Sequence, residues 1–226
     1  MTDPGANPCD FSGSKLVCVR GGRVVFANLE FGLSAGDALV LLGPNGSGKS
    51  SLLRLMAGLL KPFSGALAWQ GQPVVENPEG HAHRTHYVGH HDAIKPVLSV
   101  AENLRFWARL HEPEAVAAGR RVENALDRFG LSHLAAIPGK MLSAGQKRRT
   151  NLARLLAAPS PLWLLDEPTT ALDRKSIKVL ETVMAEHRAE GGMVVLSTHA
   201  DVDLPGAREL HLDGFAPSEE LAEMFL

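Results

Sequence analysis

Three short runs of consecutive apolar residues organise the chain. They are DALVLLG (37–43), PLWLLDE (161–167) and GMVVLSTH (192–199), and each ends abruptly in polar residues. Continuous hydrophobicity over so few residues is typical of parallel strands that are covered on both faces. Ligands bind beyond the carboxyl ends of strands in open α/β sheets, so we expect the three endings to converge on one site.

A different pattern precedes the first of these runs. KLVCVR and RVVFANLEF flank Gly21 and Gly22, which predicts two antiparallel strands joined by a tight turn. Residues 1–14 are rich in Pro, Gly and Ser and are expected to form a flexible tail. The sequence therefore predicts an antiparallel β subdomain ahead of an α/β core, with residues 15–226 as one domain.

Between the first and second core strands, apolar residues recur at helical spacing. SVAENLRFWARLH opens with Ser99 and Glu102 at the spacing of a capping box. PEAVAAGRRVENALDRFG follows, and Gly130 is placed to end this second helix. We expect a helical subdomain at about residues 95–140, inserted into the α/β core. Its apolar faces are made of Val100, Leu104 and Trp107 in the first helix and of Val122, Leu126 and Phe129 in the second.

The first apolar run ends in GPNGSGKSS, which matches the P-loop pattern GxxxxGK[ST]. Glycines allow backbone N–H groups to surround phosphate oxygens, and the helix predicted to follow adds the positive end of its dipole. Lys49 is expected to reach the β- and γ-phosphates, and the Ser50 hydroxyl to ligate Mg²⁺. The predicted nucleotide-binding residues of this loop are Gly43, Pro44, Asn45, Gly46, Ser47, Gly48, Lys49, Ser50 and Ser51.

The other two strand endings supply further chemistry for a phosphate site. Asp166 ends the second run, where its carboxylate can hold Mg²⁺ directly or through water. Glu167 follows as the candidate base that orients and deprotonates an attacking water. His199 follows the third run, where an imidazole can contact the γ-phosphate; a structural role for this histidine is the alternative.

Composition excludes some classes of protein without identifying a partner. The 226 residues are 45% hydrophobic and 21% charged, which is typical of a globular protein. Lys and Arg number 23 against 25 Asp and Glu, so no net field favours nucleic acid or an anionic membrane. No apolar run approaches the ~20 residues of a membrane span, and the start does not read as a secretory signal. Cys9 and Cys18 lack the CxxC spacing of metal sites and are expected to be free thiols.

LSAGQ (142–146) decides among the classes of P-loop protein. It precedes a predicted helix and offers a second anion a hydroxyl, a close backbone approach and a positive dipole end. With GPNGSGKS before it, and LLDEP, ALD (171–173) and His199 after it, the chain resembles the ATP-binding cassette family over nearly its whole length. The resemblance implies an α/β P-loop NTPase core of cassette type with the N-terminal antiparallel β subdomain and the inserted helical subdomain.

Several functional properties are implied by this resemblance. Cassettes of the family hydrolyse ATP with Mg²⁺ and pair head to tail, so that each signature closes over the ATP of the other chain. In this chain that implies a homodimer with two composite sites and with Asp173 near the dimer seam. The signature residues that would act in trans are Leu142, Ser143, Ala144, Gly145 and Gln146.

The resemblance also implies partners. A single cassette without a membrane span is expected to work with integral membrane subunits of a transporter, peripherally, at the cytoplasmic face of the bacterial inner membrane. Nucleic acid is not an expected partner, because cassettes of DNA repair carry coiled coils or zinc modules and translation factors of the family carry two cassettes. A P-loop kinase would lack LSAGQ and ALD.

Four stretches narrow the resemblance to the ATP-binding subunits of bacterial heme exporters of cytochrome c maturation. They are LSAGQ in place of the commoner LSGGQ, PLWLLDEPTTALD, YVGHHDAIKPVLSVAENLRFW and STHADVDLPGARELHLDGF. This implies heme export or delivery, with heme-handling proteins among the partners. A cassette that serves an exporter of a lipid, a drug or a metal chelate is the alternative, because the ATPase chain does not contain the translocation path.

Two positions depart from the usual cassette pattern. Where cassettes commonly stack adenine on an aromatic residue, this chain has Arg20, whose guanidinium plane can still stack on a base. Where they usually have a glutamine that links Mg²⁺ and the attacking water to the membrane partner, the chain has His90. We expect His90 to take part in hydrolysis or its coupling, although a neutral imidazole cannot reproduce both functions of an amide.

Two groups of polar residues need an interpretation. Lys147, Arg148 and Arg149 follow the signature, and we expect them to form a solvated helix face rather than part of the phosphate site. HAHRTHYVGHH (81–91) contains five histidines without a recognisable metal-ligand spacing. We expect His81, His83 and His86 of this segment to line a polar loop and the strand that follows, and not to form a dedicated metal or heme site.

Overall fold

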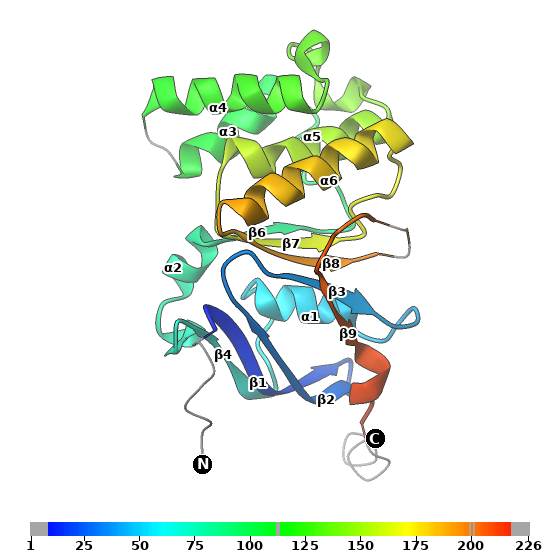
Figure 1. The fold of residues 1–226 in the computed structure, drawn as a ribbon. Coiled ribbons are helices and arrows are strands. Elements are labelled where there is room, and N and C mark those ends of the chain that lie inside the picture. Colours follow the sequence, from blue (N-terminus) through cyan, green and yellow to red (C-terminus); the bar gives the residue numbers. More distant parts are fainter. Residues whose placement is uncertain (1–8, 112–113, 199, 201, 218–226) are drawn as a thin grey trace.

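Two β-sheets form the framework of the protein, which a computed structural model describes for residues 9–111, 114–198, 200 and 202–217 (Figure 1). The first sheet is antiparallel, and its strands lie in the order β2-β1-β4-β5. The second sheet is parallel, in the order β6-β7-β8-β3-β9. The antiparallel strands are β1 (Phe11–Arg20), β2 (Arg23–Leu33), β4 (Ser64–Trp69) and β5 (Gln72–Pro73), and the parallel strands are β3 (Ala38–Leu42), β6 (Thr85–Val88), β7 (Leu162–Asp166), β8 (Met193–Ser197) and β9 (Arg208–His211).

Helices cover both faces of the parallel sheet. Figure 1 shows α1 between the two sheets, whereas α5 and α6 lie on the opposite face of the parallel sheet. Short 3₁₀ helices occupy Val74–Glu76, Ser132–Leu134, Gly139–Met141 and Leu212–Phe215. The α-helices are α1 (Lys49–Met56), α2 (Pro78–His83), α3 (Val100–His111), α4 (Ala115–Arg128), α5 (Ala144–Ala157) and α6 (Arg174–Ala189). Among the described residues, no helix is both long and apolar enough to cross a membrane.

The antiparallel pair at the N-terminus begins earlier than predicted. Strand β1 starts at Phe11, which is fully buried and pairs with Leu33 of β2 and Trp69 of β4. The expectation of a flexible tail through residue 14 is therefore wrong for residues 11–14, because burial of Phe11 and pairing on both sides hold them in the sheet. Residues 1–8 lie outside the described part of the chain. The predicted turn is confirmed, since Gly21 and Gly22 have φ of 56° and 74° between the two strands.

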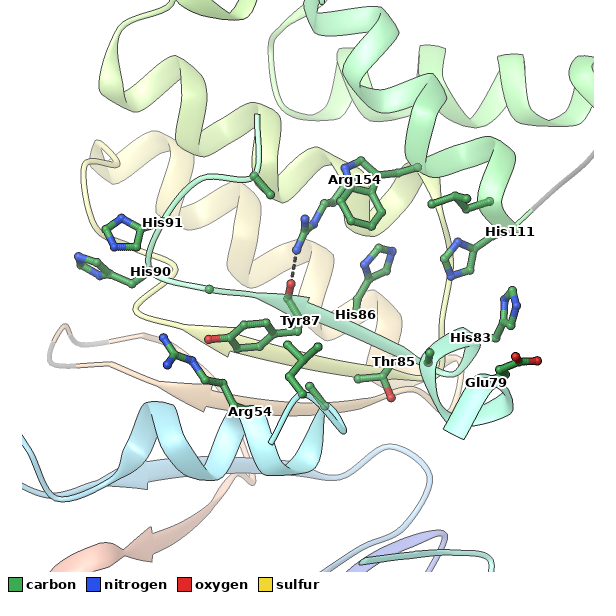
Figure 2. Close-up of a pocket in the computed structure, with 17 residues that line it drawn as sticks. Arg54, Glu79, His83, Thr85, His86, Tyr87, His90, His91, His111 and Arg154 are labelled. Carbon is green, nitrogen blue, oxygen red and sulfur yellow. Dashed lines mark hydrogen bonds between the residues drawn. The ribbon is translucent and has the colours of Figure 1, made fainter. Parts of the chain in front are cut away.

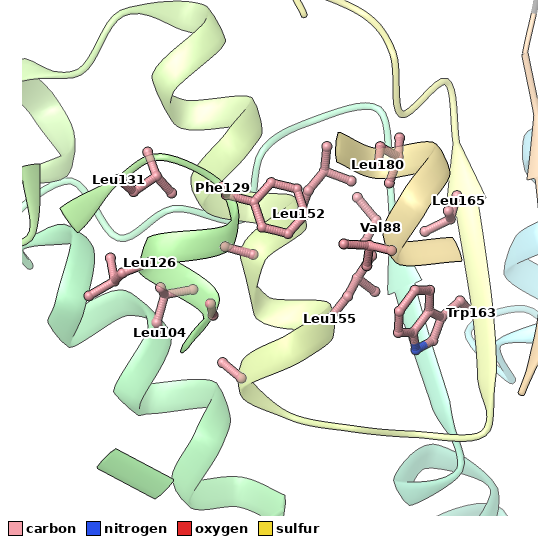
Figure 3. Packing of buried hydrophobic residues seen from close by; sticks show 14 of the residues in the cluster. Val88, Leu104, Leu126, Phe129, Leu131, Leu152, Leu155, Trp163, Leu165 and Leu180 are labelled. Atoms are coloured by element: carbon pink, nitrogen blue, oxygen red, sulfur yellow. The ribbon is translucent and has the colours of Figure 1, made fainter. Parts of the chain in front are cut away.

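The three apolar runs form neighbouring parallel strands, as predicted, and their side chains alternate between two cores. In β3, Leu39 and Leu41 face the core that α1 shares with the antiparallel sheet. In β7, Trp163 and Leu165 face the core on the side of α5 and α6 (Figure 3). A hydrophobic core covers each face of the sheet, which explains why these strands are apolar up to their polar last residues, Asp166 in β7 and Ser197 in β8. Replacing a fully buried leucine such as Leu41 with Ala should cost about 2–5 kcal/mol of stability.

The helical subdomain packs α3 and α4 against α5, as well as against each other. The predicted capping box begins α3, because the Ser99 backbone N–H donates to Glu102 Oε2 at 2.8 Å and the Glu102 N–H donates to Ser99 Oγ at 3.2 Å. Gly130, with φ of 63°, follows the end of α4 as expected. The apolar packing thus reaches past residue 140 into α5, the helix that begins at the signature (Figure 3).

Cys9 is exposed and Cys18 is buried, and both are free thiols, as the spacing predicted. Burial raises the pKa of the Cys18 thiol above its ordinary value. This thiol is therefore protonated at neutral pH and packs as a small apolar group in the core between the two sheets.

Candidate nucleotide-binding site

The P-loop connects β3 to α1 and is shaped by its glycines. Gly43, Gly46 and Gly48 have φ of 140°, 86° and 102°, a range that other residues rarely adopt. At Gly48, which caps α1, a Cβ would also lie 2.6 Å from Val25 Cγ1. Lys49 Nζ donates to the carbonyl oxygens of Gly43 at 2.6 Å and of Pro44 at 3.1 Å, so the ammonium lies within the curve of the loop.

The ends of the three core strands converge on Asp166, as the sequence predicted. The Asp166 carboxylate is buried, and its Oδ1 accepts hydrogen bonds from Ser50 Oγ at 3.0 Å and from Ser197 Oγ at 2.8 Å. Ser50 lies in the first turn of α1, which the P-loop joins to β3, and Ser197 is the last residue of β8. His199, predicted to contact the γ-phosphate from the same strand end, lies outside the described residues.

Glu167 adopts a strained backbone conformation directly after β7. Its φ is 49°, a region that costs a non-glycine residue on the order of 1–3 kcal/mol. The Glu167 N–H donates to the Ser197 carbonyl oxygen at 2.9 Å, and its own carbonyl oxygen accepts from Arg148 at 2.6 Å. Hydrogen bonds on both sides therefore hold this conformation at the end of the strand.

A cavity of about 590 Å³ opens in front of these residues. Lys49, Ser50, Asp166 and Glu167 line it together with Asn45, Gly46, Gly48 and Ser51 of the P-loop. Arg20, from the end of β1, and His90, from the loop after β6, line the same cavity, as expected from their places in the cassette pattern. The cavity thus combines a cationic loop, an open helix N-terminus and two carboxylates, which suits a nucleotide phosphate chain and its metal ion.

Besides Ser197, two hydrogen-bonded side chains near Asp166 were not predicted from the sequence. Tyr87 of β6 directs its hydroxyl to Asp166 Oδ2 at 3.4 Å, and Arg54 of α1 shares a side-chain hydrogen bond with Tyr87. Burial raises the pKa of the Tyr87 phenol, which therefore stays protonated. A tyrosine inside an apolar strand carries no sequence signal for this role, because its partners come from other elements.

The signature segment caps a helix away from this cavity. The Ser143 side chain accepts from the Gln146 N–H at 3.3 Å, and Gln146 Oε1 accepts from the Ser143 N–H at 2.9 Å, so a complete capping box begins α5. Leu142 is buried, whereas Ser143 and Ala144 are exposed. None of the described residues that line the nucleotide cavity comes from 142–146. The signature of this chain is therefore free to act on something other than its own P-loop.

Asp173 and Gly145 show how the ALD segment lies next to the signature. A Cβ on Gly145 would lie 2.9 Å from the Ala171 carbonyl oxygen, so the two backbones are close. Asp173 caps α6, since its Oδ1 accepts from the Ser176 N–H at 2.8 Å. The hydrogen bond to Ser176 also lowers the pKa of this exposed carboxyl, which keeps it ionised.

A second cavity, which we call the histidine groove, has a volume of about 670 Å³ and adjoins the first at His90. His83, His86, His90, His91 and His111 line it; Figure 2 shows His90 and His91 at one end and His83 and His111 at the other. His86 is buried, and loss of solvation lowers its pKa to about 3. The described residues contain no group of three or more histidine, cysteine, aspartate or glutamate side chains that could hold a metal ion.

The expectation of a polar loop is wrong for His81 and His83, which both lie in α2. His81 is buried, and its Nε2 pairs with the Met56 carbonyl oxygen at 2.7 Å. His86 lies in β6, the strand that follows, as expected; it is buried there, and its Nε2 pairs with the Ala158 carbonyl oxygen. Both imidazoles serve as polar bridges inside the protein, because each finds a carbonyl of a neighbouring segment.

The expectation that residues 147–149 form a solvated basic face is wrong for Arg148. This side chain is only 2% exposed and donates to backbone carbonyls around Glu167. Arg149 donates to the carbonyl oxygen of Phe129 at the end of α4. The charge run could not show this, because burial of Arg148 depends on the loops that fold over α5.

Comparison with known proteins agrees with the geometry. A family model described as ABC transporter matches residues 26–170. The cytochrome c biogenesis ATP-binding export protein of Paramagnetospirillum magneticum is 78% identical over 93% of this chain and 97% of its own length. Its namesake from Rhodospirillum rubrum is 63% identical over 95% of this chain and 91% of its own length.

Solved structures give the same fold. The ATP-binding subunit of an ABC transporter superposes with a TM-score of 0.76 at 26% identity, covering 84% of this chain and 79% of that one. The protein cbiO1 from Clostridium perfringens, part of the transporter complex cbiONQ, gives a TM-score of 0.73 at 26% identity, with 86% and 80% covered. The predicted α/β P-loop fold of cassette type is thereby confirmed.

Proposed function

The chain belongs to the ABC transporter family and is an ATP-binding cassette that hydrolyses ATP. On this basis we propose that it drives heme export or delivery for the maturation of c-type cytochromes. The observation that carries this proposal is 78% identity, over nearly the whole chain, to a cytochrome c biogenesis ATP-binding export protein. The match covers 93% of this chain and therefore includes much more than the ATP-binding motifs.

We propose that Lys49 and the P-loop N–H groups bind the β- and γ-phosphates of ATP, while Arg20 stacks on the base. Ser50 and Asp166 are the proposed ligands of Mg²⁺. They fit this ion because a hydroxyl and a carboxylate oxygen, 3.0 Å apart, provide the hard donors that Mg²⁺ prefers. When bound, Mg²⁺ would neutralise charge that develops on the phosphates.

Glu167 is the proposed general base. It would accept a proton from water as the water oxygen bonds to the γ-phosphorus and the bond to the β–γ bridging oxygen breaks, which yields ADP and phosphate. His199 is proposed to contact the γ-phosphate and His90 to orient the attacking water. Support for His90 comes from its place on the wall of the nucleotide cavity.

We also propose that two copies of this chain pair head to tail. Ser143, Gly145 and the rest of the signature would then close over the ATP of the partner copy, with Asp173 at the seam. Two features support this arrangement. The signature helix begins with an exposed serine and a positive dipole end, and the described lining of the chain's own nucleotide cavity contains no signature residue.

The proposed partners are integral membrane subunits and heme-handling proteins, at the cytoplasmic face of the bacterial inner membrane. His90 supports a link between ATP and such a partner, because it lines both the nucleotide cavity and the histidine groove. A membrane subunit seated in the groove would contact the same loop that faces the nucleotide.

Deleting the gene and complementing it tests the proposed function. We expect the deletion strain to lack c-type cytochromes, measured by heme staining of membrane proteins. The unchanged gene should restore them, whereas Glu167→Gln should not, because hydrolysis is lost. Intact c-type cytochromes in the deletion strain would instead favour an exporter of a lipid, a drug or a metal chelate, and proteins that co-purify with the chain would then indicate which.

A further inference from the structure

Arg148 is a buried arginine on α5, three residues after Gly145 of the signature. Its guanidinium donates five hydrogen bonds to two other segments. Nη2 donates to the carbonyl oxygens of Asp166 at 3.0 Å and Glu167 at 2.6 Å, and Nε donates to that of Pro168 at 3.1 Å. Nη1 donates to the Gly89 carbonyl oxygen at 3.0 Å and to Asp92 Oδ1 at 3.2 Å.

The first segment that Arg148 holds is the strained turn of Glu167. Three successive carbonyls, from Asp166 to Pro168, point at one planar guanidinium, while the Glu167 N–H is held by Ser197 on the other side. The direction of the Glu167 side chain follows from its φ of 49°, which this set of hydrogen bonds maintains. Loss of the guanidinium would leave these carbonyls without its hydrogen bonds and free the turn to relax toward an ordinary conformation.

The second segment is the loop that carries His90. Gly89 and Asp92 flank the two histidines of this loop, and both accept from Nη1 of Arg148. Asp92 Oδ1 also accepts from Asn151 Nδ2 at 3.2 Å, one turn further along α5. The Arg148–Asp92 ion pair is shielded on the arginine side, where the side chain is 3% exposed. Helix α5 therefore holds, through Arg148, the two segments that bring Glu167 and His90 to the nucleotide cavity.

We propose that Arg148 is a positioning residue, which holds the Glu167 turn in its hydrolytic conformation and ties it to the signature helix and the His90 loop. The inference rests on the proposed role of Glu167 as general base. An arginine suits this position because its rigid planar fork carries five donors, whereas the ammonium of lysine has three donors at one point. A lysine at this position would keep the charge beside Asp92 but would not reach acceptors on both sides.

The test compares Arg148→Lys and Arg148→Gln with a matched control, in the full-length chain co-expressed with its membrane subunits. Arg188→Gln is the control, because Arg188 also joins two segments through backbone carbonyls, those of Gly36 at 2.9 Å and Pro205 at 2.8 Å, outside the nucleotide cavity. We expect both Arg148 variants to lower kcat for ATP hydrolysis by about 10- to 100-fold, while KM stays within about three-fold. Arg188→Gln should lower the thermal midpoint without lowering kcat.

A double-mutant cycle with Glu167→Gln separates positioning from general destabilisation. If Arg148 acts through Glu167, adding Arg148→Gln to Glu167→Gln should cause no further loss of the residual hydrolysis. The proposal would be overturned if the double variant lost hydrolysis by the product of the two single losses, or if kcat were unchanged in the Arg148 variants. Where Arg148→Gln does not fold, Arg148→Lys carries the same test. Parental hydrolysis by Glu167→Gln alone would refute the proposed role of Glu167 itself, which is a different failure from normal kcat in Arg148→Lys.

Discussion

The nucleotide cavity and the histidine groove share His90 but differ in what their polar groups do. In the nucleotide cavity, the P-loop after β3, with its lysine, and the two carboxylates at the end of β7 face one space. In the histidine groove, two of the polar side chains bond to backbone carbonyls of the protein. His86 pairs with the Ala158 carbonyl oxygen, and Arg154 donates to that of Tyr87 (Figure 2). The Arg154 guanidinium also lies 4.5 Å from the centre of the Trp107 ring. Many potential metal ligands in one segment of the sequence are therefore weaker evidence for a binding site than a few polar side chains from separate elements that face one cavity.

The two cavities also differ in the charge of the side chains that line them. Desolvation lowers the pKa of His86 to about 3, and it also lowers the pKa of His111, whose ring stacks on that of His86 with 5.4 Å between centroids. Both rings are therefore neutral at pH 7, although the sequence shows a cluster of titratable groups. The nucleotide cavity is lined instead by Lys49 of the P-loop and by the carboxylates of Asp166 and Glu167.

The largest expected effect lies in the nucleotide cavity. Glu167→Gln should lower ATP hydrolysis by about 10²- to 10³-fold and leave ATP binding intact, because an amide cannot accept the proton from the attacking water. The variant should accumulate an ATP-bound dimer, measured by size-exclusion chromatography with light scattering.

The matched control for this prediction lies in the groove. His111→Ala removes an imidazole that lines the histidine groove but is not among the described residues that line the nucleotide cavity, so it should keep the parental rate of hydrolysis. Equal losses in the two variants would contradict the division of roles between the cavities.

A smaller effect is expected on stability in acid. The folded protein holds His86 with a pKa near 3, below its ordinary value of 6.5, so protons bind preferentially to the unfolded chain. This contribution to stability is fully present above pH 6.5 and is lost as the pH falls toward 3. Between pH 6.5 and 5 we expect His86 to reduce the free energy of unfolding by about 1.5 kcal/mol, measured by urea denaturation at each pH.

Replacing His86 tests the assignment of this pH dependence. His86→Gln should weaken the dependence, since its side chain does not titrate, whereas replacing the exposed His133 with Gln should leave it unchanged. An identical dependence in the His86 variant and the parent would show that other groups cause the acid effect.

The smallest effect is expected at the residue that both cavities share. His90→Ala should retain ATP binding and lower hydrolysis, or its coupling to the membrane partner, by about three- to ten-fold, the range expected for one lost hydrogen bond. Its neighbour His91 lines the histidine groove and is absent from the described lining of the nucleotide cavity, so His91→Ala is the matched control and should hydrolyse ATP at the parental rate. Unchanged hydrolysis and unchanged cytochrome maturation with His90→Ala would remove His90 from the proposed mechanism.

Prediction from sequence succeeded where the signal is local. Glycines at 43, 46 and 48 indicated a P-loop because only glycine readily adopts the conformations seen there. Ser99 and Glu102 indicated a helix start because their side chains satisfy the first turn of their own helix. Continuous apolar runs indicated buried parallel strands because both faces of the sheet are covered.

Prediction failed where burial depends on distant segments. Phe11 is part of a sheet because β4 pairs with β1, and the Pro-rich composition before it carries no trace of that pairing. Tyr87, Arg54 and Ser197 join the site through partners that are far away in the chain, so no spacing could reveal them.

The sequence by itself determined the chemistry of this protein: a P-loop, a carboxylate pair and a signature, in an order that identifies an ATP-binding cassette. Only the tertiary structure decided which charged and titratable residues are buried. Arg148 stands among three basic residues that read alike in sequence, yet it alone among them is buried and holds the Glu167 turn. The reason is physical, because the cost of burying a charge depends on acceptors that the fold brings from elsewhere in the chain.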